Sequence, residues 1–206
     1  GVHDSNASLA PYLRTAPSPT VVSTGTWVVT MVPGGDLSRL DSRRDMLANV
    51  DITGAPVACA RFMGGREYAA IASATGRAVD ETYAVDEVGM AIGRREWALP
   101  DFSAGSGPFS GRSPRIVGDS RALCDIYLAL MMDLELDLIG STGQVIIDGV
   151  VGKNEIVCGL IAALRPDQAI CVAPESIAHA CLAVADWDSP AKAPPAMNRI
   201  FRVSIC

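Results

Sequence analysis

The apolar residues in the first third of the chain form short runs that predict β-strands. Each run is rich in β-branched or aromatic residues and stops at a turn that carries glycine, proline or a small polar residue. Runs of this kind, separated by short turns, pair as an antiparallel meander. A short helix capped by Ser5 or Asn6 is expected before them, and a helix over residues 66–75 after them. The expected strands are Val21–Val22, Trp27–Val32, Met46–Thr53 and Pro56–Phe62.

Farther along the chain, apolar residues recur at spacings of three and four, which predicts a long amphipathic helix. Asp119 or Ser120 is expected to begin this helix, and Gly140 is expected to end it. The face expected to be buried is formed by Leu123, Ile126, Tyr127, Leu130, Leu134 and Leu138.

After this helix, short apolar strands alternate with helices. Strands are expected at residues 144–148 and 169–173, and helices at residues 154–164 and 176–187. Such alternation predicts parallel strands joined by crossover helices. Two regions lack a clear pattern. Residues 77–119 are rich in glycine and proline and are expected to form a long irregular loop, and the tail at residues 190–206 has no predicted placement.

Composition and charge narrow the class of protein. The chain has 206 residues, of which 49% are hydrophobic and 19% charged, and its net charge is −6. A chain of this kind is globular and long enough for one domain with a sizeable core, or at most for one domain and a small partner. It lacks the basic patch of a nucleic-acid-binding protein and any apolar stretch of membrane length. Six cysteines without a C-x-x-C pair and only two histidines argue against structural zinc and favour the cytoplasm.

The turn between the first two expected strands concentrates groups that suit a phosphate. Ser23, Thr24, Gly25 and Thr26 supply three hydroxyls and one glycine. Glycine lets another group approach the backbone closely, and hydroxyls together with free backbone N–H groups bind phosphate oxygens. A turn of this composition also occurs with no ligand at all, so the neighbouring motifs must decide between the two interpretations.

Three stretches, in order along the chain, resemble motifs of the FGGY family of carbohydrate kinases. They are the G-x-x-D loop at Gly1–Asp4, the Thr-Gly-Thr turn at Thr24–Thr26, and the segment Asp148–Asn154. In that family the loop carries a catalytic aspartate, the turn holds ATP phosphates, and the last segment binds adenosine. The resemblance implies an α/β fold of the ribonuclease H-like, actin-type ATPase class, with an antiparallel meander followed by parallel strand–helix units.

The resemblance also implies a function. Residues 1–206 are expected to form a single nucleotide-binding domain, the C-terminal half of a two-domain kinase whose sugar-binding N-terminal domain is absent from this chain. The intact enzyme is expected to transfer a phosphoryl group from ATP to a sugar, ketose or polyol hydroxyl. Mg²⁺ is expected to be held mainly through the ATP phosphates, with no metal site made by the protein. The isolated chain is expected to be inactive. The sequence does not identify the sugar, and it leaves a homodimer open.

Carried over residue by residue, the resemblance assigns Asp4 as the base that accepts the proton of the attacking hydroxyl. The phosphate-binding residues are expected to be Thr24, Gly25 and Thr26. The expected adenosine-binding residues are Gly149, Val150, Gly152 and Asn154.

Several of these residues also suit a purely structural role. Asp4 is suited to cap a helix, and Asn154 is a natural N-cap for the helix that follows it. Val150 stands where the family pattern has a second glycine, and its Cβ is expected to crowd the ribose or α-phosphate. This departure favours a rival hypothesis, a non-catalytic actin-fold module that binds a nucleotide or a partner. Gly64-Gly65, which opens a helix, is a weaker candidate for an anion site.

Overall fold

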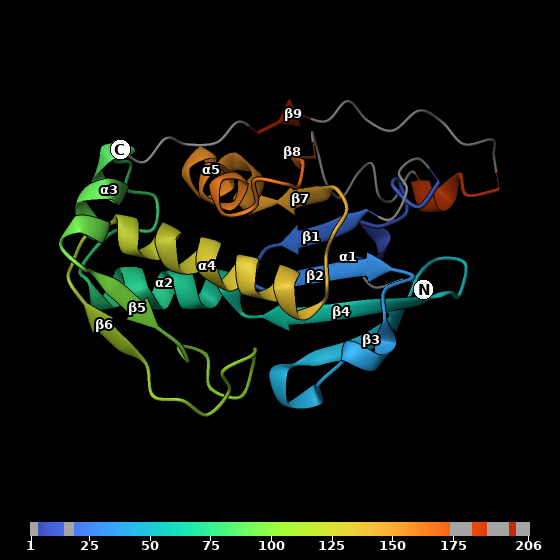
Figure 1. Ribbon diagram of the computed structural model, residues 1–206, viewed down its shortest axis with the longest axis horizontal. Coiled ribbons are helices and arrows are strands. Elements are labelled where there is room, and N and C mark those ends of the chain that lie inside the picture. Colours follow the sequence, from blue (N-terminus) through green and yellow to red (C-terminus); the bar gives the residue numbers. More distant parts are fainter. Residues whose placement is uncertain (1–3, 15–18, 174–182, 189–197, 201–206) are drawn as a thin grey trace.

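A mixed β-sheet runs through the molecule, with its longer helices packed on one face (Figure 1). The computed structural model describes residues 4–14, 19–173, 183–188 and 198–200. Within these residues the sheet has the strand order β3-β4-β2-β1-β7-β8-β9. The strands are β1 Thr20–Thr24, β2 Val28–Pro33, β3 Met46–Val50, β4 Pro56–Phe62, β7 Val145–Gly149, β8 Ile170–Val172 and β9 Asn198–Arg199.

The first half of the sheet is the predicted antiparallel meander. β1 pairs with β2, β2 with β4, and β4 with β3, all antiparallel. β4 has the predicted bounds, whereas β3 ends at Val50 instead of continuing to Thr53. The reason is a side-chain turn: Asp51 Oδ1 accepts hydrogen bonds from the backbone N–H groups of Thr53 and Ala55, at 2.8 and 3.0 Å. This satisfies the backbone locally and stops the strand.

The second half of the sheet is parallel, as the strand–helix alternation predicted. β1 pairs in parallel with β7, and β7 with β8. The crossover after β7 consists of the 3₁₀ helix η3, Val150–Lys153, and the helix α5, Glu155–Leu164. Part of the unplaced tail forms β9, which pairs antiparallel with β8. Most of the helix predicted at residues 176–187 lies outside the described residues.

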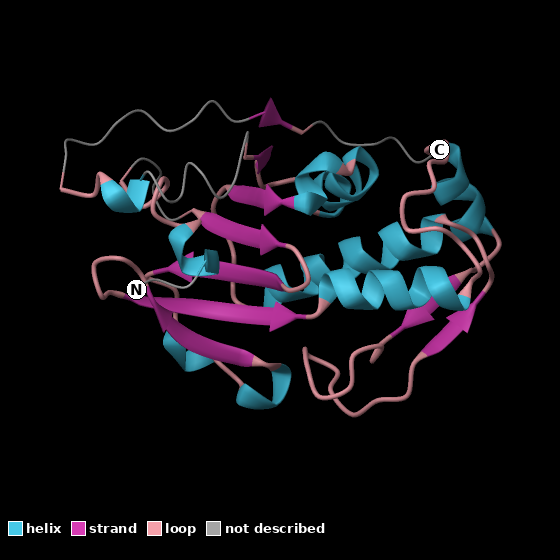
Figure 2. Cartoon of the chain, turned by 180° about the vertical axis from the view of Figure 1, so that it is seen from behind, coloured by secondary structure: helices cyan, strands magenta, loops and turns pink. Residues whose placement is uncertain are grey.

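The long helices cover one face of the sheet, and the short α1, Asp4–Ala7, lies on the other (Figure 2). The larger core cluster joins the helices to side chains such as Val22, Phe62 and Ile147. The smaller cluster, on the α1 side, packs Leu9 and Tyr12 against the sheet. The other helices are α2 Gly64–Ala74, α3 Asp86–Gly93 and α4 Ala122–Leu138, and the other 3₁₀ helices are η1 Leu37–Arg39 and η2 Ser42–Arg44.

The buried face predicted for α4 was only partly right. Leu123 and Tyr127 are buried, but Leu130 is 50% exposed, and the other three predicted residues are only partly buried. α4 packs against α2 and α5 as well as against the sheet. The buried part of its surface is therefore wider than a single apolar stripe. As a result, the carboxylates of Asp125 and Glu135 are buried in it too.

The prediction of a long irregular loop over residues 77–119 was wrong. This region contains α3 and a separate two-stranded sheet made of β5, Trp97–Leu99, and β6, Arg115–Val117. Strands of three residues are too short to give a readable alternation of apolar and polar positions.

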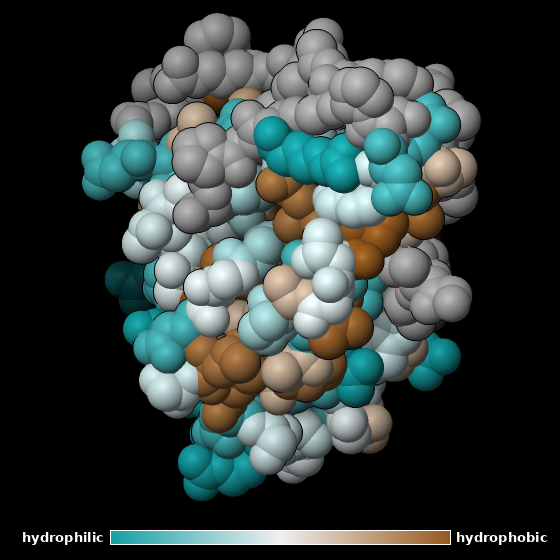
Figure 3. Space-filling model, turned by 90° about the vertical axis from the view of Figure 1, so that its right-hand side faces the viewer, coloured by the Kyte–Doolittle hydropathy of each residue, from teal (hydrophilic) through white to brown (hydrophobic). Residues whose placement is uncertain are grey.

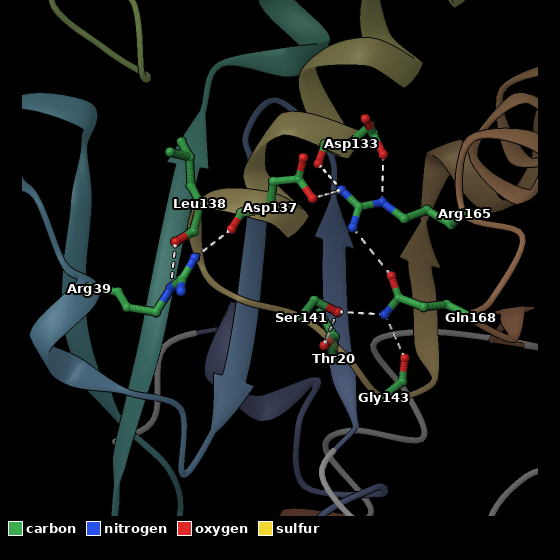
Figure 4. Close-up of polar contacts among 9 residues, drawn as sticks. All are labelled: Thr20, Arg39, Asp133, Asp137, Leu138, Ser141, Gly143, Arg165 and Gln168. Carbon is green, nitrogen blue, oxygen red and sulfur yellow. Dashed lines mark hydrogen bonds and ion pairs between the residues drawn. The ribbon is translucent and has the colours of Figure 1, made fainter.

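Two arginines bind the C-terminal end of α4 and hold it in place (Figure 4). Arg39 donates to the carbonyls of Asp137 and Leu138, at 2.9 and 3.2 Å. Arg165, just after α5, contacts the carboxylates of Asp133 and Asp137, at 2.5 and 2.7 Å. Carbonyls in the last turn of a helix lack intrahelical partners, and cations there are favoured by the helix dipole. These contacts fix α4 against both halves of the fold.

The same network reaches the start of β1. Gln168 Nε2 donates to Ser141 Oγ at 3.0 Å, and Ser141 Oγ lies 2.7 Å from Thr20 Oγ1 (Figure 4). β4 also begins at this end of the sheet, which faces the viewer in Figure 3 and exposes apolar atoms among polar ones. Val50, which pairs with Pro56 at the start of β4, is 55% exposed. The candidate phosphate-binding turn lies at the opposite end.

Candidate functional site

The turn between β1 and β2 rests directly on the backbone of α2. Gly25 N–H donates to Trp27 C=O at 2.8 Å, and Gly65 N–H donates to Thr26 C=O at 3.2 Å. A Cβ at Gly65 would lie only 2.4 Å from Gly25 C=O, a separation that no side chain tolerates. The turn and the start of α2 therefore meet backbone to backbone, and this contact requires glycine at position 65.

The two threonines of the turn have different surroundings. Thr24 is buried; its hydroxyl donates to Asp148 C=O at 2.6 Å and accepts from Val151 N–H at 3.1 Å. Its proton is therefore used to join the ends of β1 and β7. Thr26 is exposed, and its hydroxyl has no hydrogen-bond partner among the described residues. Of the two hydroxyls, that of Thr26 is the one free to donate to a ligand.

Gly149, the last residue of β7, adopts a conformation that excludes other residues. Its φ is +97° and its ψ is −153°, a region that is essentially confined to glycine. A Cβ there would lie 2.1 Å from Thr24 C=O. Since Thr24 and Gly149 are register partners at the carboxyl ends of adjacent parallel strands, this glycine sets how closely the turn and the following segment approach.

The rest of the predicted adenosine segment divides into an exposed residue and two structural ones. Val150 is 62% exposed, so its side chain projects from the surface next to Gly149. Gly152 packs against β8, because a Cβ there would lie 2.7 Å from Val172 Cγ1. Asn154 caps α5, as its alternative role predicted: its Oδ1 accepts from the N–H groups of Ile156 and Val157, both at 3.1 Å.

The buried carboxylate at the start of this segment, that of Asp148, was given no role in the sequence analysis. Asp148 is only 4% exposed, and its Oδ1 has no hydrogen-bond partner among the described residues. Burial raises the pKa of the Asp148 carboxyl from 3.8 to about 6, and the Gly149 N–H opposes that shift. Burial and then the charge of Asp148 raise the pKa of Tyr12 to about 12. The sequence did contain a signal for this buried carboxylate, because Asp148 is the one acidic residue in an otherwise apolar strand.

α1 does not lie next to the turn. Asn6 Nδ2 donates to Asn49 Oδ1 at 2.8 Å and to Val50 C=O at 3.0 Å. Both acceptors lie beside the start of β4, whereas Phe62, at its end, pairs with Val28 next to the turn. α1, which begins at Asp4, is therefore at the other end of the sheet from the turn, as Figure 1 also shows. The remainder of the predicted G-x-x-D loop lies outside the described residues.

Two kinds of feature are absent from the part of the chain that the structure describes. Among these residues, no three His, Cys, Asp or Glu side chains lie close enough together to hold a metal ion. The helices of the same part of the chain include none whose length and apolar character would let it cross a membrane.

Comparison with known proteins identifies relatives of this domain. A sequence profile described as "Carbohydrate kinase FGGY, C-terminal domain" matches residues 16–194. The chain is similar in structure to a carbohydrate kinase from Novosphingobium aromaticivorans, with a TM-score of 0.84 and 30% identity over 100% of this chain and 47% of that one. No curated protein sequence matches the chain significantly.

More distant structures share the fold. A xylulose kinase from Rhodospirillum rubrum has a TM-score of 0.68 and 17% identity over 98% of this chain and 46% of its own. A glycerol kinase from Plasmodium falciparum with ADP has a TM-score of 0.63 and 12% identity over 94% of this chain and 45% of its own. The chain thus spans less than half the length of each of these proteins. Taken together with the family match, these likenesses show that the chain belongs to the FGGY carbohydrate kinase family as a C-terminal domain and has the actin-like ATPase fold that its sequence predicted.

Proposed function

We propose that the protein carrying this chain is an ATP-dependent kinase that phosphorylates a hydroxyl group of a sugar, ketose or polyol. The chain supplies the nucleotide site, and a preceding domain binds the acceptor. Membership of the FGGY family supports carbohydrate kinase chemistry in general. The presence of ADP in the similar glycerol kinase supports a nucleotide as the ligand.

The observation that carries this proposal is the close backbone contact around the turn. Side chains at Gly149 and Gly65 would collide with the carbonyls of Thr24 and Gly25, respectively. With glycine at both positions, the turn, the segment after β7 and the start of α2 lie together with backbone groups at the surface. Glycine at these positions leaves the surface open to close approach, and the N-terminus of α2 beside the turn favours an anion such as a phosphate group.

Within this surface, Gly25 and Thr26 are the proposed phosphate-binding residues. Thr26 offers an unpaired hydroxyl, and the space where a Gly25 Cβ would point is open for at least 4 Å. Thr24 is proposed to shape the site, because its proton is already donated to Asp148 C=O. Gly149, Val150, Gly152 and Asn154 form the proposed adenosine side.

ATP-dependent phosphoryl transfer uses Mg²⁺ to neutralise charge on the phosphates. The protein would hold this ion through the ATP phosphates. Asp4 is proposed as the base, a role for which it must lie beside the γ-phosphate in the full-length protein and not at the opposite end of the sheet, where α1 lies in this structure. As the acceptor oxygen bonds to the γ-phosphorus and the bond to ADP breaks, the hydroxyl proton then passes to the Asp4 carboxylate.

A second candidate function is a non-catalytic actin-fold module that binds a nucleotide or a partner. The exposed Val150 favours it, because a side chain projects where the family pattern has glycine. The position of α1 also favours it, since Asn6 holds this helix away from the turn.

Acceptor-dependent ADP release by the full-length protein distinguishes the two functions. With MgATP and a panel of free sugars, ketoses and polyols, the kinase proposal expects one acceptor class to raise ADP release well above the hydrolysis measured without acceptor. MgATP binding without acceptor-dependent release would support the non-catalytic module. Absence of both binding and turnover would overturn the nucleotide site.

A further inference from the structure

A buried carboxylate stands behind the proposed adenosine segment. Asp125, in the first turn of α4, is 1% exposed. Its Oδ1 accepts hydrogen bonds from Tyr68 OH at 2.7 Å and from Asn154 Nδ2 at 2.8 Å, and its Oδ2 accepts one from Tyr83 OH. Arg121, one helical turn earlier, places Nη1 4.0 Å from Oδ1. A buried charge is tolerated when it is met by donors in this way.

The same cluster fixes the segment between α2 and α3. Arg121 is 4% exposed and donates from Nη2 to Val79 C=O at 2.9 Å and to Tyr68 OH. Its guanidinium lies 4.9 Å from the centre of the Tyr68 ring and 5.7 Å from that of Tyr83. Four separate segments therefore meet at Asp125: α2, the segment before α3, α4 and the start of α5. Arg121 Nε and Nη1 have no hydrogen-bond partner among the described residues, but the bonds that are made join the four segments and restrict their relative movement.

Within this network the amide of Asn154 has only one favourable orientation. Its Oδ1 faces the N–H groups of Ile156 and Val157, and its Nδ2 faces the carboxylate of Asp125. If the amide were turned over, its nitrogen would face two donors and its oxygen would face a carboxylate. An amide nitrogen carries two N–H groups, and Asp125 takes one of them. The second can serve only as a donor.

We infer that Asp125 is a positioning residue for nucleotide binding, acting through Asn154. By fixing the Asn154 amide, it presents the remaining N–H as a donor to an acceptor atom on the base or ribose of a nucleoside triphosphate. This inference rests on the proposed adenosine role of Asn154. It also gives a reason for the burial of an acidic side chain behind the proposed adenosine segment.

Calorimetric titration of the full-length protein with MgATP and MgGTP tests this inference. Asp125→Asn keeps the shape but removes the charge that orients the amide. It should weaken MgATP binding about tenfold, the usual effect of losing one hydrogen bond to a charged group, and it should narrow the difference between MgATP and MgGTP. If this variant does not fold, Asp125→Ser replaces it in the same titrations.

The matched control is Glu135→Gln. Glu135 is also a buried carboxyl on α4, hydrogen-bonded to Thr30 Oγ1 at 2.7 Å, but it lies toward the other end of the helix. Its substitution should leave MgATP affinity unchanged. An equal loss of affinity in both variants would mean that any disturbance of α4 affects binding, and would overturn a specific role for Asp125.

A double-mutant cycle tests whether Asp125 acts through Asn154. Asn154→Ser keeps a capping oxygen for α5 but removes the amide donor. In that background, Asp125→Asn should cause no further loss of MgATP affinity. Additive losses would overturn the inference, as would an Asp125→Asn protein that binds MgATP as tightly as the wild type. A wild-type protein that does not bind MgATP would instead overturn the proposed nucleotide site itself.

Discussion

Replacement of Asp148 by asparagine should stabilise the protein at neutral pH. The carboxyl is buried at the end of β7, one of its oxygens has no hydrogen-bond partner among the described residues, and burial raises its pKa from 3.8 to about 6. A raised pKa means that the folded state disfavours the charge relative to the unfolded chain. An asparagine side chain at this position would have the same shape without that charge.

The size and pH range of this effect follow from the shift of the pKa of Asp148. Below pH 3.8 the carboxyl is protonated in both the folded and unfolded states, so its contribution to stability is fully present. As the pH rises from 3.8 to about 6, only the unfolded chain loses its proton, and stability falls. Above the folded pKa the loss is complete. A shift of this size corresponds to about 3 kcal/mol, or to about 6–12 °C in Tm for a domain of this length.

Thermal unfolding of the 206-residue chain and of Asp148→Asn at several pH values between 4 and 8 measures this difference. The stability gain of the variant should be small at pH 4 and should reach its plateau above about pH 6. Asp80→Asn, at an exposed carboxylate, is the control and should show no comparable gain. A gain that is the same at pH 4 and pH 8 would refute the reasoning, because it would not arise from ionisation. A loss of stability at pH 8 would show that the Asp148 charge is favourable in the folded state.

Three further predictions concern the proposed site. Asp4→Asn in the proposed full-length kinase should lower kcat about 10²–10⁴-fold with little change in the KM for ATP; retention of most of kcat would leave Asp4 as a helix cap. Thr26→Val should raise the KM for ATP as well as lower kcat in the same steady-state assay, because it removes a phosphate donor; an unchanged KM would contradict that role. The isolated chain should bind ATP with a Kd on the order of 1 mM or weaker. In calorimetry Val150→Gly should tighten that binding, and low-micromolar affinity of the wild type would contradict crowding by Val150.

Much of the fold could be predicted from local pattern, because local residues determine it. Short-range chemistry accounts for the bounds of β4 and for the helix cap at Asn154. It also accounts for the order along the chain, in which antiparallel strands precede parallel ones. The buried face of α4 could not be predicted in the same way. It depends on α2 and α5, which cover sides of the helix that its own sequence marks as polar or mixed. Leu130 is half-exposed and Asp125 is buried for this reason.

The candidate site was chosen from the composition of one turn and from a family resemblance, neither of which shows tertiary hydrogen bonds. The turn pointed to Gly25 and the resemblance to Gly149, and both glycines lie at the same end of the sheet. The hydroxyl of Thr24 looked equivalent to that of Thr26 in the sequence. Only the tertiary contact with Asp148 C=O, from a strand far along the chain, shows that its proton is already committed. Side chains whose partners lie far away in sequence carry no local signal of pairing.

The shape of the proposed phosphate site depends on side chains that are missing rather than on those that are present. Removal of the Thr26 hydroxyl would take away one donor and leave the turn where it is, because the turn is held by its backbone contact with Gly65. A methyl group at Gly65 or Gly149, in contrast, would have to displace a carbonyl oxygen that now lies 2.4 or 2.1 Å from the position of its carbon. The first contact joins the turn after β1 to α2 and the second joins β1 to the end of β7, so the displacement would separate these elements. The departure at Val150 is of another kind: its side chain is mostly exposed, so the fold accommodates it without strain. It follows that Val150 bears on the proposed ligand site beside Gly149 and not on how the domain folds, whereas the two glycines bear on both.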